Sequence, residues 1–209
     1  AIVSNCVVSS NTSLVAGGGA ADGALYNCVL AGNSAGYGGG AYGSVLRNVT
    51  AAGNVSTRGA GAGVQECDVA NSIVWSNSGG TNAVGGAVRY TCTTPDPGGT
   101  GNIVSGPGFV DYAGGDLRLD SSSMCVNAGD NAFAARATDI GGNDRVRASV
   151  VDLGAYESPY APIDAYAGEH GAISPSGRVG VVVGSSQVFH VSPNPAHLLA
   201  NVLVDGAGI

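Results

Sequence analysis

A seven-residue pattern that begins and ends with asparagine recurs in the first 77 residues, as NCVVSSN, NCVLAGN, NVTAAGN and NSIVWSN. The leading asparagines, spaced 22, 21 and 23 residues apart, are Asn5, Asn27, Asn48 and Asn71. The trailing asparagines keep the same intervals and are Asn11, Asn33, Asn54 and Asn77. Self-similarity at this period is typical of a solenoid.

Apolar residues hold fixed places around the leading asparagine. The positions two before it, one after it and three after it carry mostly small or aliphatic side chains in every repeat. One straight strand cannot bury all three positions, because alternate side chains face opposite sides. The chain must therefore bend at the asparagine, which tolerates the left-handed conformation of a sharp corner. Glycine clusters such as GGGA recur at the same period and predict a second bend.

Stacked repeats of this kind predict a parallel β-helix. One rung of about 22 residues cannot bury its inner face alone, but rungs about 4.8 Å apart pair as parallel strands and share a core. The asparagines of a column then form structural ladders of hydrogen-bonded amides. With 36 glycines and many β-branched residues, α-helix is disfavoured. We expect an all-β, right-handed, single-stranded solenoid with rungs over residues 1–104.

The repeat stops in the second half of the chain. Asn102 suggests a fifth corner, and the Pro- and Gly-rich residues 93–101 before it suggest an extruded loop. Residues 105–157 are expected to form a last rung or cap that covers the open end of the core. The apolar residues available for this cover are Phe109, Leu117, Leu119, Ile140, Leu153 and Tyr156.

Beyond the expected cap, the composition changes again. A Pro-containing hinge is expected at residues 158–162, followed by an incomplete antiparallel β module at 163–209. Apolar residues that suit its short strands are Ile173, Val179, Val181, Val183, Val188, Val202 and Val204.

These patterns resemble known families. The repeats are similar to those of bacterial right-handed parallel β-helix surface proteins of the pectate-lyase-like superfamily, and to chlamydial polymorphic outer-membrane proteins in their Gly-Gly pattern. The segment ending in DLGAYE resembles the terminal segment of such helices, although Gly141 and Met124 depart from its usual form. GAISPSGRVGV and VLVDG resemble a divergent internalin-type B repeat. The resemblance implies a bacterial protein that is secreted or displayed at the cell surface or outer membrane.

Charge and composition limit the classes of partner that the chain can bind. The net charge is −7, and all eight basic residues are arginine, which argues against nucleic acid because phosphate contacts need a basic patch. No apolar run is long enough to predict a membrane span. The chain starts in mid-pattern without an initiator Met or a signal-peptide layout, so we interpret it as a fragment. We expect a monomer.

Enzymatic sites occur on this architecture in polysaccharide lyases and polygalacturonases. Such sites need several clustered acids and a basic residue. Asp22 and Glu66 fall in one column but two rungs apart, roughly 10 Å, beyond the usual carboxylate separation of an inverting glycosidase. We interpret them as solvated surface acids and predict no catalytic residue.

Metal binding is not indicated either. The run DIGGND lacks the alternating carboxylates of an EF-hand loop, and no Cys/His cluster has metal-ligand spacing, so we predict no metal and no cofactor. The acids of the end segment have a structural interpretation instead. Asp139, Asp144 or Asp152 would pair with Arg145 or Arg147.

The five cysteines leave their pairing open. Cys6 and Cys28 occupy one column of adjacent rungs, where parallel neighbours have poor geometry for a disulfide, so we interpret them as small buried residues. Cys92 and Cys125 can pair across the end segment, and Cys67 has no evident partner.

Outward positions near the corner supply the candidate ligand-binding residues, Tyr26, Arg47 and Trp75. Flat aromatic rings beside a guanidinium suit sugar rings or a protein partner. Two functions remain open. The favoured one is a noncatalytic secreted or cell-surface spacer and adhesin that binds polysaccharide or a surface protein. The alternative is a fragment of a carbohydrate-active β-helix enzyme, a polysaccharide lyase or glycoside hydrolase, without its catalytic rungs.

Overall fold

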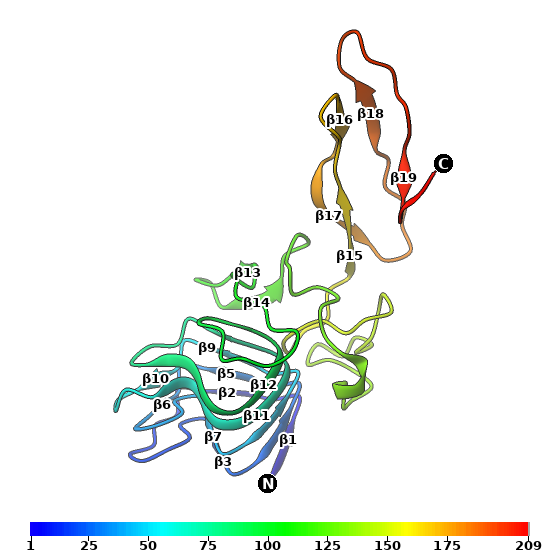
Figure 1. Ribbon diagram of the computed structural model, residues 1–209. Helices are drawn as coiled ribbons and strands as arrows, with labels where there is room; N and C mark the ends of the chain where they lie inside the picture. The colour runs from blue at the N-terminus through cyan, green and yellow to red at the C-terminus, as the bar shows by residue number, and fades with distance from the viewer. Residues whose placement is uncertain (209) are drawn as a thin grey trace.

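The chain folds into a parallel β-helix, followed by an irregular segment and a small antiparallel module (Figure 1). The computed structural model describes residues 1–208. Strands of successive repeats pair in parallel, with Val3 opposite Leu25, Leu25 opposite Leu46 and Leu46 opposite Val69. This register is the one that the asparagine spacing predicts, and the expected all-β parallel solenoid is confirmed.

Each rung contributes strands to several parallel columns. Before the asparagine corner these are β1 (Ile2–Ser4), β4 (Ala24–Tyr26), β8 (Val45–Arg47) and the middle of β11 (Gly61–Trp75). After the corner they are β2 (Val7–Ser9), β5 (Val29–Ala31), β9 (Thr50–Ala52) and the end of β11. Elsewhere β3 (Ala20–Ala21) pairs with β7 (Ala41–Tyr42), and β6 (Ser34–Ala35) pairs with β10 (Val55–Ser56). Finally, β12 (Thr81–Thr93) runs along β11.

The leading asparagines form the corners. Their φ angles are all positive, at 52° for Asn5, 50° for Asn27, 54° for Asn48 and 50° for Asn71. Asparagine is one of the few residue types other than glycine that adopts this left-handed conformation readily. The corner is therefore a local property of each repeat.

The fifth corner differs from the prediction. Because β12 pairs Arg89 with Ala70 and Thr91 with Ser72, the residue opposite Asn71 is Tyr90, which has a φ of 45°. Asn102 lies one rung further on and accepts a hydrogen bond from the Thr91 N–H at 3.1 Å. The prediction of a corner at Asn102 is wrong because the fifth rung is shorter and has no asparagine at its corner. The expected loop is exposed over residues 94–101, whereas Thr93 is the buried last residue of β12.

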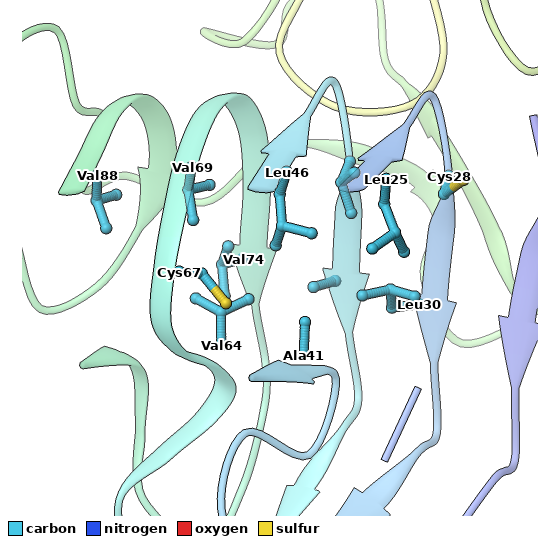
Figure 2. Packing of buried hydrophobic residues seen from close by; sticks show 12 residues of the cluster. Leu25, Cys28, Leu30, Ala41, Leu46, Val64, Cys67, Val69, Val74 and Val88 are labelled. Carbon is cyan, nitrogen blue, oxygen red and sulfur yellow. The ribbon is translucent and has the colours of Figure 1, made fainter. Parts of the chain in front are cut away.

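The core of the helix consists of stacked aliphatic columns. Leu25, Leu46, Val69 and Val88 lie in one row on successive rungs (Figure 2). The first three are almost fully buried. Each such side chain contributes about 1.5–3 kcal/mol to folding, but only when a neighbouring rung covers it. The side chains at the inner positions inferred from the sequence are thus buried only because a neighbouring rung is stacked on them.

Residues 105–157, which we call the closing segment, contain β13 (Phe109–Asp111), β14 (Asp116–Leu119) and the 3-10 turn η1 (Asn131–Phe133). The six apolar residues expected to cover the last rung pack instead against outward-facing side chains of the β-helix, including Val29, Ile73 and Cys92. Within residues 1–208, none of the six joins the inner-core cluster. The segment therefore covers the side of the helix across several rungs. The apolar side chains two positions after each corner form the surface on which it packs.

The C-terminal module follows the closing segment and projects away from the β-helix (Figure 1). Its antiparallel pairs are β15 (Tyr160–Ala165) with β17 (Gly177–Val182), β16 (Gly171–Ser174) with β18 (His190–Pro193), and β19 (Leu203–Val204) with β20 (Ala207–Gly208). The hinge expected at 158–162 is wrong in its second half, because residues 160–162 already pair with β17. Of the expected strand residues, Val183, Val188 and Val202 lie outside the strands. No helix within residues 1–208 has the length and apolar character to cross a membrane.

Candidate binding surface at the asparagine corner

The trailing asparagines form a continuous amide ladder. Each side-chain Nδ2 donates to the Oδ1 of the asparagine on the next rung, from Asn11 to Asn33 at 3.1 Å, Asn33 to Asn54 at 3.0 Å and Asn54 to Asn77 at 2.9 Å. The same Oδ1 atoms also accept the backbone N–H of the preceding asparagine. The ladder continues to Asn82 at 2.9 Å, a member that the sequence does not reveal because it follows Asn77 by only five residues.

The leading asparagines use their side chains differently. Asn27 donates to the Oδ1 of Asn5 at 3.2 Å, but Asn71 forms two hydrogen bonds with the backbone of Asp130, at 2.8 and 2.9 Å. Asn48 donates to the carbonyl of Asp152 at 3.4 Å. In place of one unbroken ladder, this column holds the closing segment against the corner.

Of the three candidate ligand-binding residues, two lie together. Tyr26 and Arg47 are register partners on β4 and β8, whereas Trp75 ends β11 beyond the corner, opposite Ala52. Trp75 packs in the outward apolar cluster with Phe109 of the closing segment. It is half-buried and serves the docking of that segment.

Arginine and aromatic side chains from the helix and the closing segment meet around Arg47. Asp68 receives two guanidinium groups, from Arg47 at 2.6 Å and from Arg89 at 2.9 Å. The Phe133 ring lies against both, with its centroid 5.5 Å from the Arg47 guanidinium carbon and 4.7 Å from that of Arg89. Such cation–π contacts stabilise exposed sites by about 0.5–1 kcal/mol.

This group extends in both directions along the corner. The Tyr90 ring is 6.2 Å from that of Phe133, and the Arg136 guanidinium lies 4.3 Å from the Tyr26 ring. We call the six residues the Arg-aromatic strip: Tyr26, Arg47, Arg89, Tyr90, Phe133 and Arg136. The guanidinium groups of Arg47 and Arg89 pair with Asp68, and that of Arg136 lies over the Tyr26 ring, so the strip carries three positive charges on an acidic chain.

The sequence did not point to four members of the strip. Arg89 occupies the same outward column as Tyr26 and Arg47, but its column is apparent only once Tyr90 is known to be the fifth corner. Phe133 and Arg136 belong to the closing segment, which has no repeat from which their position can be counted. No periodic signal would have found them.

The acids considered for catalysis stand apart from each other. Asp22 and Glu66 are both exposed and have positive φ angles of 50° and 54°, so each forms a second corner of its rung. The Asp22 carboxylate lies over Gly43 of the next rung, and the Glu66 carboxylate lies over Gly85 of the rung after its own. Both side chains therefore lean in the same direction along the stack and do not converge on a shared substrate position.

A buried ionic cluster holds the end of the closing segment. Arg145 is 1% exposed and pairs with Glu157, and its guanidinium also donates to the carbonyl of Gly154 at 3.1 Å. The expected pairing of Arg145 or Arg147 with Asp139, Asp144 or Asp152 is therefore wrong in its partner. Arg147 and Asp144 are exposed.

The other buried acids of this cluster accept backbone hydrogen bonds. Asp152 accepts from Asn127 at 2.7 Å and from Ser158 at 2.6 Å, while Asp139 accepts from Glu157 at 2.8 Å. Burial raises the pKa of Asp152 to about 6 and that of Glu157 to about 8, and a neighbouring carboxylate, Asp139 for Asp152 and Asp152 for Glu157, adds to each rise. These carboxylates organise the segment, and none of them lines either of the two cavities described next.

Two cavities lie away from these buried carboxylates, and the second of them is lined in part by Arg89 of the strip. One of about 450 Å³ in the C-terminal module is lined by His170 and Leu198 among others, and one of about 420 Å³ lies between residues 85–89 and 97–100. The His170 and His197 rings stack at 4.2 Å. Residues 1–208 contain no group of three or more His, Cys, Asp or Glu that could hold a metal ion.

Comparison with known proteins identifies no relative. No family model matches the chain, and neither a curated protein nor a solved structure matches it. The function is therefore inferred from the geometry described above.

Proposed function

We propose that this chain is a noncatalytic β-helix that acts as a rigid spacer and adhesin outside a bacterial cell, binding acidic polysaccharide on the Arg-aromatic strip. The observation that carries the proposal is the strip itself. It brings three arginines and three aromatic rings together on one face of a chain whose net charge is −7.

The strip has the chemistry that uronate-containing polysaccharide requires. Guanidinium groups bind carboxylates through paired, charge-assisted hydrogen bonds, and aromatic faces stack on the apolar faces of sugar rings. Arg136 is exposed and Arg89 is 28% exposed, so both can reach a ligand, whereas the 13% exposed Arg47 mainly holds Asp68 in place. A negatively charged glycan is favoured over a neutral one because the single Asp68 does not balance three arginines.

The spacer role is supported by the continuity of the stack. Parallel pairing runs from β1 to β12, and the amide ladder from Asn11 to Asn82 links every rung. The asparagine repeats, the DLGAYE ending and the internalin-like C-terminal sequence support placement among bacterial pectate-lyase-like surface proteins. The enzyme alternative is weakened because the Asp22 and Glu66 carboxylates lean along the stack in the same direction.

The experiment measures binding of polygalacturonate and of neutral dextran by isothermal calorimetry. Wild type should bind polygalacturonate and not dextran, and Arg89→Gln and Arg136→Gln should each weaken binding by about tenfold. Arg118→Gln is the matched control, because Arg118 is an exposed arginine that pairs with Asp116 and lies outside the strip.

Three results would overturn the proposal. The first is equal affinity of wild type and both strip variants, and the second is no binding at all. The third is the appearance of unsaturated uronate products that Glu66→Gln abolishes, which would establish a lyase.

A further inference from the structure

Two cysteines from distant parts of the chain meet beneath the closing segment. Cys92 lies on β12, opposite Ile73 in the outward column, and Cys125 lies in the closing segment. Both are fully buried in the apolar cluster that also contains Leu153. The Cys92 thiol donates to the Ser105 carbonyl at 3.2 Å. The neighbouring Cys125 thiol together with burial raises the pKa of Cys92.

The backbone on both sides of this pair is held in place. Cys92 is bridged to Ile103 on one side, and β11 pairs with it on the other. The Cys125 N–H donates to Ser123 Oγ at 3.0 Å, and its carbonyl accepts from the Leu153 N–H at 3.0 Å. The fold itself therefore brings the two cysteines into one buried cluster.

The other cysteines lack such a partner among the described residues. Cys6, Cys28 and Cys67 each direct the thiol to the carbonyl oxygen two residues earlier, at 3.1, 3.2 and 3.3 Å. Cys6 and Cys28 are stacked on adjacent rungs, but the Cys28 thiol reaches the Val3 carbonyl of the neighbouring rung, at 3.8 Å, and not the Cys6 thiol.

We propose that Cys92 and Cys125 form a disulfide bond that fastens the closing segment to the fifth rung when the chain folds in an oxidising environment. The oxidant is a small disulfide such as oxidised glutathione. One cysteine thiolate attacks it, forms a mixed disulfide and releases one glutathione thiolate. The second cysteine thiolate then attacks the mixed disulfide and releases the other. Each cysteine loses one proton, and the oxidant gains two electrons.

Burial dictates when this reaction occurs. A thiol enclosed by apolar side chains ionises poorly and is out of reach of glutathione, so the bond forms while the closing segment is docking. Once formed, it closes the loop between residues 92 and 125 and restricts the unfolded chain. It also anchors the part of the closing segment that carries Phe133 and Arg136 onto the strip.

The test refolds the reduced, denatured full chain in a glutathione redox buffer and then alkylates the remaining thiols under denaturing conditions. Two fewer thiols than the five present should be alkylated. Trypsin cleaves after arginine, so the crosslink should join the peptide 90–118, which contains Cys92, to the peptide 119–136, which contains Cys125. The Cys67→Ala control should give the same crosslink.

A second measurement compares melting midpoints. Reducing the oxidised wild type should lower its Tm by about 10 °C, as expected for a loop of this size in a chain of this length. The same treatment should leave the Tm of Cys125→Ala unchanged. Five alkylated thiols after refolding, a dominant crosslink that involves Cys6, Cys28 or Cys67, or a Tm insensitive to reduction would each overturn the proposal.

Discussion

Replacing one asparagine in the middle of the amide ladder tests what the repeated asparagines contribute. Asn54 is fully buried, and its Nδ2 donates to the Leu30 carbonyl at 2.9 Å and to Asn77 at 2.9 Å. Its Oδ1 accepts both the backbone N–H of Asn33 at 2.9 Å and the Asn33 side chain at 3.0 Å. Asn54→Ala removes all of these bonds and leaves a backbone N–H in the interior without an acceptor.

The magnitude follows from these losses. A buried donor left without an acceptor costs about 1–3 kcal/mol, and each further lost hydrogen bond costs about 1 kcal/mol. Part of the second cost is recovered where the remaining group still has another partner. Asn54→Ala should therefore lower the free energy of unfolding by about 3–4 kcal/mol. Asn77 keeps one partner, because its Oδ1 still accepts the backbone N–H of residue 54.

Asn11→Ala is the matched control, because it is the same substitution in the same column at the exposed end of the ladder. Water can replace the lost bond to Asn33 there, so the loss should be about 0.5–1 kcal/mol. Urea unfolding followed by far-UV circular dichroism measures both variants, with an unchanged m-value showing that the folded states are comparable. Equal losses for the two variants would refute the idea that buried ladder amides stabilise the stack more than a solvated amide does.

Three further predictions concern the core, the flank and the buried acids. Leu46→Ala should cost about 2–5 kcal/mol in urea unfolding because it leaves a cavity between stacked rungs, whereas the same change at Leu198, 92% exposed, should cost less than about 0.5 kcal/mol. Deleting residues 106–157 should cause concentration-dependent association in sedimentation while β-type circular dichroism remains, because outward Ile73 loses its cover; a monomer would contradict this. The Glu157 carboxyl keeps its proton up to about pH 8 in the folded state but loses it near pH 4.5 when unfolded, so its contribution to stability is fully present below pH 4.5 and is lost as the pH rises to about 8. Glu157→Gln should flatten that fall in denaturation midpoints measured across the range, and an unchanged slope would contradict the assignment.

Much of the β-helix could be predicted because each rung repeats the same short pattern of an asparagine corner and apolar inner positions. The asparagine corner needs only a residue that tolerates positive φ, and the inner columns follow from counting outward from it. Where this pattern is missing from the sequence, the prediction failed. Tyr90 forms a corner without being an asparagine, and Asn102 was mistaken for one.

The candidate site was only partly predictable for a related reason. Tyr26 and Arg47 could be placed side by side because both are counted from an asparagine corner, and the structure pairs them. Trp75 was grouped with them because the outward positions were treated as one surface, although the corner sends its strand along a different side. Whether an outward side chain is exposed to solvent or covered depends on the closing segment. The position of that segment cannot be counted from the sequence because it contains no repeat.

The sequence by itself determined the rung period, the parallel register and the inner core, because these depend on contacts between adjacent copies of one pattern. Only the tertiary structure decided that the closing segment lies along the flank, that Arg145 pairs with Glu157 and that Phe133 and Arg136 complete the strip. Those contacts join residues up to 118 positions apart, as between Arg145 and Asn27. They depend on the shape and hydrogen-bonding needs of a surface that exists only once the rungs have stacked.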